Sequence, residues 1–335
     1  MKRLTILDVA ERAGVSVGTV SNALNRPEIV AEKTLEQILA VMDEIGFVRN
    51  AAARQLTGAV SPAIGLVVLD LENPFFTEIY RGVEAAANEA GYLVMVSGFA
   101  GDPSRERRQL QLLEEQRVAG ILATRVRRGS ARLYSDMRKR GMPIVLLDRR
   151  SSRRNQCSAS VDDIAGGRLA AEHLIELGHK RIGLVNGPRE WNQCADRRTG
   201  FLDTLDKAGL TLAATHDIEL EAMTLAAGEA AAHQMLERKR LPSAIFCGND
   251  LLALGAEHAL LGAGCKVPGD VAVVGYDDVA FATMAFVPVT SVRQPAYELG
   301  RKGAELLLDE ANGGGHRHEQ VVFTPELVVR QSTVG

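Results

Sequence analysis

Apolar residues in the first fifty positions recur at helical spacing in short segments. The apolar stripe of the first segment consists of Val9, Ala10 and Ala13. Thr5, with Asp8 three residues later, is typical of a capped helix start, and Gly14 is suited to the turn that follows. The pattern predicts a short helix that ends at a glycine turn.

A second helix is predicted directly after this turn, and its outer face is unusually polar. Ser16 is a suitable N-cap, and Val20 and Leu24 are spaced to face inward. The residues left to point outward are Val17, Gly18, Ser21, Asn22 and Asn25. Such a pair indicates a helix-turn-helix, a motif that enters a DNA groove, although an ordinary helical hairpin at the edge of a larger domain is the alternative.

A third helix is predicted over 32–45, with Gly46 placed to end it. Three helices can close a small core, so we expect an all-α DNA-binding headpiece over 1–48. The next segment, 49–61, is rich in alanine and only weakly amphipathic. A helix of about eight residues is marginal in isolation, so we expect a hinge helix and linker here that orders only when something packs on it.

From Ile64 the pattern changes to apolar runs that alternate with amphipathic segments. Strands are expected over 64–69, 93–96, 120–123, 144–147, 182–185, 244–247 and 271–274. Helices are expected near 76–90, 104–117, 165–177, 197–208, 225–236 and 251–262. The alternation predicts parallel sheets covered by helices on both faces. Two such lobes in series over 62–335 would form a hinged ligand-binding domain.

Composition agrees with a globular chain of about two or three domains, since 46% of the 335 residues are hydrophobic and 24% are charged. No apolar run approaches the roughly 18 residues that span a bilayer, and Asp8 and Glu11 interrupt any signal-peptide core. We therefore expect a cytoplasmic protein with no membrane partner. The cysteines are Cys157, Cys194, Cys247 and Cys265. Their wide spacing predicts reduced, partly buried residues, and neither a disulfide nor a zinc framework.

The charge balance is unusual for a protein that binds nucleic acid. The net charge is −3, and residues 1–60 hold seven basic and seven acidic residues. DNA binding would therefore need charges segregated by face, phosphate contacts from hydroxyls, amides and helix N-termini, and a dimer that doubles the footprint. The basic stretch 125–154 could bind a phosphate or a partner protein, but a solvated surface is the simpler interpretation.

The order of these parts, together with several short motifs, resembles the lactose/galactose repressor family of bacterial transcription regulators. The motifs are Asp8-Val-Ala, Ala13-Gly-Val-Ser16, Thr19-Val-Ser21, Asn25, Asn50 to Leu56, Ile64-Gly65, Gly178-His179, Asn249-Asp250 and Gly275-Tyr-Asp277. The resemblance covers essentially the whole chain. It implies a small helix-turn-helix headpiece followed by a two-lobed α/β domain like that of periplasmic binding proteins.

The resemblance also implies which residues contact DNA. The positions matching the family's base-reading residues are Val17, Gly18 and Asn22, of which Asn22 can pair with adenine and Val17 can pack on a thymine methyl. Phosphate or positioning contacts, or else plain helix caps, are expected from Thr5, Ser16, Thr19, Ser21 and Asn25. The linker candidates are Asn50, Ala53 and Leu56. Leu56 matches the wedge that kinks the minor groove at the centre of a palindromic operator. Leu35 stands where the family often has arginine, which puts one backbone contact in doubt.

A second set of candidates lies near strand ends, where α/β sheets place ligands. These are Asn73, Phe75, Phe76, Asp148, Arg149, Arg197, Asn249, Asp277 and Gln294. Each could instead be a core, cap or turn residue, with Arg197 expected to open a helix. Together they resemble the sugar site of bacterial ribose-binding proteins, which implies a monosaccharide effector with ribose the leading candidate. Trp191 and Met223 depart from that pattern and leave a sugar acid or a nucleoside open.

The function predicted from these observations is a dimeric, sugar-responsive transcriptional repressor that needs no cofactor and is not an enzyme. The chain lacks a leucine-heptad tail, so we expect a homodimer and not a tetramer. A periplasmic-type sugar carrier is an alternative that the first sixty residues argue against. An enzyme is another, but the sequence has no phosphate-binding GxxxxGK[ST], no GxGxxG after the first strand, no GxSxG and no metal-spaced His/Cys cluster.

Overall fold

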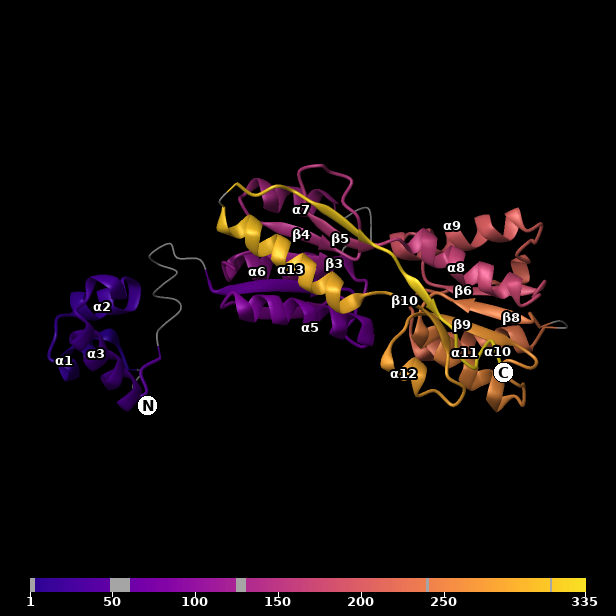
Figure 1. Ribbon diagram of the computed structural model, residues 1–335, viewed down its shortest axis with the longest axis horizontal. Coiled ribbons are helices and arrows are strands. Elements are labelled where there is room, and N and C mark those ends of the chain that lie inside the picture. Colours follow the sequence, from indigo (N-terminus) through magenta and orange to yellow (C-terminus); the bar gives the residue numbers. More distant parts are fainter. Residues whose placement is uncertain (1–3, 49–60, 125–130, 239–240, 314) are drawn as a thin grey trace. The chain divides into compact units, whose positions relative to one another are not determined.

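The computed structural model of the protein describes residues 4–48, 61–124, 131–238, 241–313 and 315–335 (Figure 1). The chain divides into two units, Met1–Val60 and Ser61–Gly335. Within the described ranges, no helix is both long enough and apolar enough to cross a membrane.

The first unit contains the predicted helices. They are α1 (Ile6–Ala13), α2 (Val17–Asn25) and α3 (Glu32–Glu44), with a 3-10 turn at Pro27–Ile29. The Asp8 carboxylate accepts hydrogen bonds from the Thr5 backbone N–H at 2.7 Å and from the Thr5 hydroxyl at 2.6 Å. Gly14 ends α1 with φ of 62°, a left-handed conformation that glycine adopts without steric penalty. The predicted helix-turn-helix is confirmed.

A small core joins these three helices. Its fully buried residues include Val9, Val20 and Ile38. On α2, Val20 is buried as predicted, but Leu24, which was also expected to face inward, is only half-buried, and Ala23 is buried in its place. On α3, the buried residues are Ile38 and Met42, and Leu39, next to Ile38 on the helix, is 52% exposed.

The second unit begins with a parallel sheet whose strands run in the order β11-β5-β4-β3-β1-β2. The strands are β1 (Ala63–Val68), β2 (Leu93–Gly98), β3 (Ile121–Thr124), β4 (Ile144–Leu147), β5 (Ser158–Val161) and β11 (Gln320–Phe323). Its helices are α5 (Pro74–Glu89), α6 (Pro103–Glu115), α7 (Ala131–Lys139) and α13 (Ala296–Asn312). Alternate strand residues serve opposite faces: Leu66 packs in the core with α5 and α13, and Val67 packs in the core with α6 and α7.

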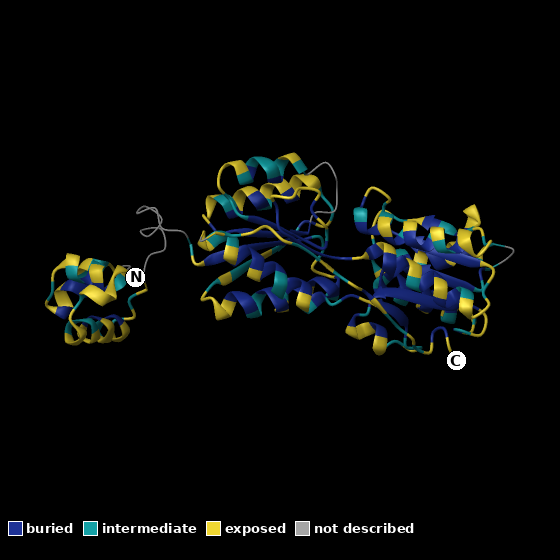
Figure 2. Ribbon diagram, turned by 45° about the horizontal axis from the view of Figure 1, so that its top comes forward, coloured by how far each residue is buried: buried dark blue, intermediate teal, exposed yellow. Residues whose placement is uncertain are grey.

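The second sheet has the order β12-β10-β9-β8-β6-β7, in which only β12 is antiparallel to its neighbour. Its strands are β6 (Ile182–Asn186), β7 (Asp217–Glu219), β8 (Ala244–Cys247), β9 (Ala272–Asp277), β10 (Thr290–Arg293) and β12 (Glu326–Val328). Its helices are α8 (Asp163–Glu176), α9 (Asn192–Lys207), α10 (Leu225–Leu236), α11 (Asp250–Gly262) and α12 (Ala280–Thr283). Figure 2 shows the strands of both sheets mostly buried beneath helices whose outer faces are exposed.

The prediction that the lobes follow one another in series is wrong. The chain crosses between them after β5, after β10 and after β11, so α13 and β11 return to the first lobe before β12 closes the second. This path brings the end of the chain against elements that precede it by more than a hundred residues. Three connecting segments, instead of one, therefore join the two lobes.

Candidate ligand cavity and DNA-reading helix

The N-terminal part of α2 presents the predicted base-reading residues on its outer face. Val17, Gly18 and Asn22 are all exposed. A Cβ added at Gly18 would meet only the Ser16 hydroxyl, at an ordinary contact distance of 3.5 Å. The described residues of this unit therefore do not require a glycine here, and its missing side chain leaves the helix backbone open to close approach.

The neighbouring polar residues take part in local hydrogen bonds. The Ser16 hydroxyl accepts from the Thr19 backbone N–H at 3.1 Å and lies 2.9 Å from the Thr19 hydroxyl. The Asn25 amide donates to the Ser21 carbonyl at 2.9 Å. Ser16 thus caps α2 and Asn25 braces its last turn, while the phosphate contacts of these residues stay a prediction. Asn50, Ala53 and Leu56 lie outside the described residues.

A cavity of about 220 Å³ lies between the two lobes, at the carboxyl ends of their strands. Nine of the eleven effector candidates line it: Asn73, Phe75, Phe76, Asp148, Trp191, Arg197, Met223, Asn249 and Asp277. Arg149 and Gln294 are not among its lining residues. The cavity also includes residues that sequence reasoning missed, namely Leu69, Asp70, Glu72, Ala100, Gln193, Cys194, Glu221, Ala222 and Thr224.

Hydrogen bonds between the lobes close the cavity on two sides. The Asn73 amide, from the first lobe, donates to Asp277 Oδ2 of the second lobe at 3.0 Å. The Gln193 amide, from α9, donates to the Asp148 carbonyl at 2.7 Å and to Asp148 Oδ2 at 2.9 Å. Gln193 lies in the first turn of α9, just past Trp191, and that position after β6 is the signal that could have identified it.

Arg197 lies under the cavity inside α9, which begins at Asn192, so the prediction that Arg197 opens a helix is wrong. The Arg197 Nε donates to Asp163 Oδ1 at 2.8 Å, and Nη1 donates to the Gly248 carbonyl at 2.6 Å. Its guanidinium carbon also lies 3.8 Å from the centre of the Tyr276 ring. Arg197, the one arginine among the described residues that line the cavity, is therefore already engaged by protein partners.

Two carboxyl groups near Arg197, those of Asp148 and Asp277, are difficult to ionise. Burial raises the pKa of Asp148 well above its ordinary value, and the charge of Asp163 adds to the effect. Burial also raises the pKa of Asp277 to about 6, although Arg197 opposes that shift. The same burial would penalise a negative charge that a ligand brought into this region, and Arg197 is already paired with Asp163.

Asp148 and Asp277 also share an uncommon backbone conformation. Their φ angles are 55° and 104°, in the region that favours glycine. Such strain persists only where the surrounding structure holds it, and it concentrates at ligand sites. Gln294 contributes from outside the cavity, because its amide donates to Asp277 Oδ1 at 2.7 Å and so fixes that carboxyl group.

Three buried polar atoms on lining residues have no hydrogen-bond partner among the described residues: Asp148 Oδ1, Gln193 Oε1 and Trp191 Nε1. Buried polar groups are nearly always paired, so such atoms indicate a ligand with matching groups. Gln193 Oε1 is an acceptor, Trp191 Nε1 is a donor, and the Asp148 oxygen accepts when the carboxyl group is ionised and can donate when it is protonated. Such a set suits a molecule that carries several hydroxyl groups.

The remaining candidates have both structural and cavity-lining roles. Phe75 and Phe76 are buried, with their rings edge to face and 5.2 Å apart, and both belong to the core of the first lobe as well as to the cavity wall. Asn73 caps α5 by accepting from the Phe75 backbone N–H. Asn249 caps α11, and its amide donates to the Met223 carbonyl at 3.0 Å.

Comparisons with known proteins agree with this architecture. Residues 5–50 match the family described as bacterial regulatory proteins, lacI family, and residues 61–329 match periplasmic binding proteins and sugar binding domain of LacI family. The chain is 34% identical to the HTH-type transcriptional repressor PurR of Photobacterium profundum over 330 residues, covering 98% of each chain. It is 32% identical to the HTH-type transcriptional regulator DegA of Bacillus subtilis, covering 99% of this chain and 98% of DegA.

Solved structures give the same result. The Lac repressor dimer bound to operator and the anti-inducer ONPF has a TM-score of 0.87 at 28% identity, over the full length of both chains. A complex of the transcriptional regulator CelR with cellobiose has a TM-score of 0.74 at 32% identity, covering 98% of this chain and 100% of CelR.

Proposed function

Because the chain belongs to the lacI family of bacterial regulatory proteins, we propose that it represses transcription under the control of a small, neutral, hydroxylated ring compound bound between its lobes. Members of this family are non-enzymatic, DNA-binding transcriptional regulators. The observation that carries the ligand assignment is the set of unpaired buried atoms on Asp148, Gln193 and Trp191.

The electrostatics of the cavity favour a neutral ligand. Arg197 is engaged by Asp163 and Gly248, while the lining residues include Asp70, Glu72 and Glu221 as well as the two buried aspartates. A sugar acid would bring a carboxylate, and among the lining residues that the structure describes no cation is left without a partner to meet it. Hydroxyl groups, by contrast, can donate to Asp148 Oδ1 and Gln193 Oε1 and accept from Trp191 Nε1.

The size of the cavity favours a monosaccharide, with ribose the leading candidate. Its volume of about 220 Å³ lies below the 300–1,000 Å³ of sites for drug-sized ligands. Phe75, Phe76 and Trp191 offer flat apolar surfaces to the C–H face of a sugar. A nucleoside is the second candidate, because those rings can also stack on a base and because several relatives carry the name PurR.

For the DNA side, we infer that a homodimer in the cytoplasm reads a palindromic operator through α2 of each copy. Exposed apolar residues on and after α12 support a second copy of the chain as a partner: Phe281 is 55% exposed, Met284 70% and Phe286 90%. Large apolar groups gathered at one exposed segment mark a protein interface. Two headpieces would also double a footprint that has no net basic charge.

Selection of operator sequences from random duplexes tests the repressor assignment, with Gly18→Val as the matched variant. The wild-type chain should enrich a palindrome, whereas the valine side chain should block close approach and weaken binding to that palindrome. No enriched palindrome would overturn the assignment.

A thermal-unfolding panel of D-ribose, a ribonucleoside and an aldonic acid tests the ligand class separately. We expect the neutral compounds to raise the melting temperature and the acid to leave it unchanged. Stabilisation by the acid alone would refute the neutral ligand while leaving DNA binding intact.

A further inference from the structure

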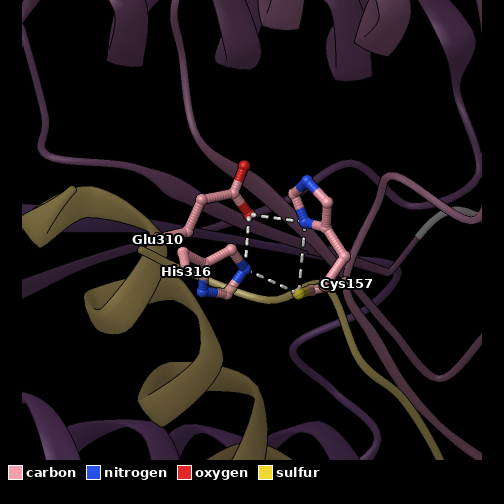
Figure 3. A group of neighbouring side chains, drawn as sticks. Cys157, Glu310 and His316 are labelled. Carbon is pink, nitrogen blue, oxygen red and sulfur yellow. Dashed lines mark hydrogen bonds and ion pairs between the residues drawn. The ribbon is translucent and has the colours of Figure 1, made fainter. Parts of the chain in front are cut away.

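A thiol, two imidazoles and a carboxylate meet at the edge of the first sheet, and none of the four residues lines the ligand cavity. They belong to Cys157, Glu310, His316 and His318. Figure 3 shows the Cys157, Glu310 and His316 side chains pointing toward one another. These residues form no metal-binding motif that is local in the sequence, because about 150 residues separate Cys157 from the other three.

The fold brings these residues together through one strand pairing. Cys157 directly precedes β5, which pairs in parallel with β11, with Ser158 opposite Gln320. The Ser158 backbone N–H donates to the Glu319 carbonyl at 3.0 Å, which aligns Cys157 with the segment that leads into β11. His316 and His318, two residues apart in that segment, both turn toward Cys157.

The distances among the ligand atoms fit a tetrahedral ion. Cys157 Sγ lies 3.1 Å from His316 Nε2 and 3.6 Å from His318 Nδ1. Glu310 Oε2 lies 3.9 Å from the first of these nitrogens and 4.0 Å from the second, and all four atoms are within 4.8 Å of one another. Zinc–ligand bonds of about 2.0 to 2.3 Å place tetrahedral ligand atoms about 3.3 to 3.8 Å apart, so only small shifts are needed.

Neighbouring groups leave His316 Nε2 and Glu310 Oε2 available to coordinate a metal. Asp309 Oδ2 accepts a hydrogen bond from His316 Nδ1 at 2.5 Å, which leaves the lone pair of Nε2 directed at the centre of the cluster. A carboxylate behind a histidine in this way is the usual outer partner of a metal-bound imidazole. Glu310 Oε2 is buried and accepts no hydrogen bond from any described residue, so this oxygen is available to coordinate a metal.

We propose that Cys157, Glu310, His316 and His318 bind one zinc ion in a closed structural site. On binding, the Cys157 thiol releases its proton to solvent and the thiolate coordinates the metal, with no change of oxidation state. Four protein ligands leave no open position for a substrate, so the ion has a structural and not a catalytic role.

The ion would link the segment between α13 and β11, where the chain has returned to the first lobe, to the residue that precedes β5. Glu310 lies in the last turn of α13, His316 and His318 precede β11, and Cys157 precedes β5. One metal would thereby join the helix that packs on α5 to the strands at the sheet edge. Because the ion binds the folded form, it should stabilise the second unit.

Metal content of the untagged, full-length chain tests this proposal. After chelator treatment and dialysis against micromolar zinc, we expect about one zinc per chain in the wild type and a loss of at least tenfold in affinity in Cys157→Ser and His318→Gln. His318 is partly exposed, so its variant should fold even if the cysteine variant does not. The matched controls Cys265→Ser and His258→Gln should keep one zinc per chain.

Two further measurements separate this site from adventitious binding. Cobalt in place of zinc should give the visible absorption of a tetrahedral site with a thiolate band that Cys157→Ser abolishes. Zinc at about 100 times its dissociation constant should raise the melting temperature by roughly 5 to 10 °C in the wild type and not in His318→Gln. Zinc bound equally by wild type and His318→Gln, or no zinc bound by wild type, would overturn the proposal.

Discussion

Asp148 and Asp277 face the ligand cavity from opposite lobes, and each combines a raised pKa with a left-handed backbone. Each is also held by an amide of the other lobe, Gln193 for the first and Asn73 for the second. Both carboxyl groups thus link the two lobes at the cavity, and Asp148 also has an oxygen, Oδ1, with no partner among the described residues. A change at Asp148 should therefore affect both the contact between the lobes and the ligand.

The raised pKa of Asp277 gives a pH dependence that can be measured. Burial raises this pKa from 3.8 to about 6, so between these values the folded chain holds a proton that the unfolded chain has lost. The contribution of Asp277 to the free energy of unfolding therefore falls as pH rises through this window, by up to about 3 kcal/mol.

Urea unfolding of wild type and Asp277→Asn, at several pH values from 4 to 7, measures that contribution. The difference in free energy of unfolding, wild type minus variant, should decrease as pH rises. The asparagine amide would face donors on Asn73 and Gln294, so the variant should be less stable than wild type at every pH. The test therefore depends on how the difference in free energy of unfolding changes with pH, and not on its size at one pH. A difference that does not vary with pH would contradict the assignment.

For single residues, the sequence predicted which side chains lie near a ligand, because parallel strands of one sheet end at the same edge and bring the residues there together. It placed Phe75, Asp148 and Asp277 in positions that do line one cavity. It could not predict that Gln294 stands behind Asp277, since both positions follow strands and only packing separates them. The sequence could not predict that Cys157 lies beside His316 and His318, because their proximity depends on the register in which β5 pairs with β11.

Neighbouring helices in both lobes approach one another at glycines. A Cβ at Gly82 of α5 would lie 2.0 Å from the Tyr297 carbonyl of α13, and one at Gly300 would lie 2.0 Å from the Ile79 carbonyl. The same arrangement joins α8 to α9, where a Cβ at Gly167 would lie 1.9 Å from the Arg197 carbonyl. Backbone contact this close fixes how each helix pair lies on its sheet.

Gly82→Ala should therefore destabilise the second unit, because the methyl group collides with backbone and not with a movable side chain. We expect a loss of at least about 1 to 3 kcal/mol in the free energy of unfolding. The matched control is Gly262→Ala in α11, where an added Cβ meets nothing within 4 Å. Chemical denaturation checks both variants, and equal stability of the two would show that the helices can separate without penalty.

The elements themselves were predicted well where apolar runs were long. The strand over 144–147 and the helix over 225–236 have the predicted bounds. The short strand β5 was missed because Ser158 and Ser160 interrupt its apolar pattern. No element was predicted after 274, and even a correct helix over 296–312 would not have revealed its packing on α5, which local periodicity does not encode.

For the whole molecule, repression by this account needs a dimer with two reading helices and a ligand that favours one arrangement of the lobes. The dimer is testable through Phe286, which is 90% exposed. Phe286→Asp should weaken self-association by about 30-fold or more, because a buried aromatic anchor is replaced by a charge. Light scattering should then report the mass of a single 36.1 kDa chain, with weaker operator binding.

The control for this change is Leu177→Asp, an exposed apolar residue at the end of α8 and outside the 281–286 segment. This variant should remain dimeric. If Phe286→Asp also remained dimeric at the same concentration, the exposed segment around α12 would not be the interface.

The central claim is that a ligand between the lobes controls the affinity of the headpieces for DNA. Its most direct test is the dissociation constant of the selected operator, measured by fluorescence anisotropy with and without saturating D-ribose. The variant Asp148→Asn serves as the comparison, because asparagine tolerates the left-handed backbone and keeps an acceptor for Gln193. The account predicts that ribose changes the wild-type constant by at least about fivefold and changes the variant's far less. An operator affinity that ribose leaves unchanged in the wild type, or shifts equally in both proteins, would contradict it.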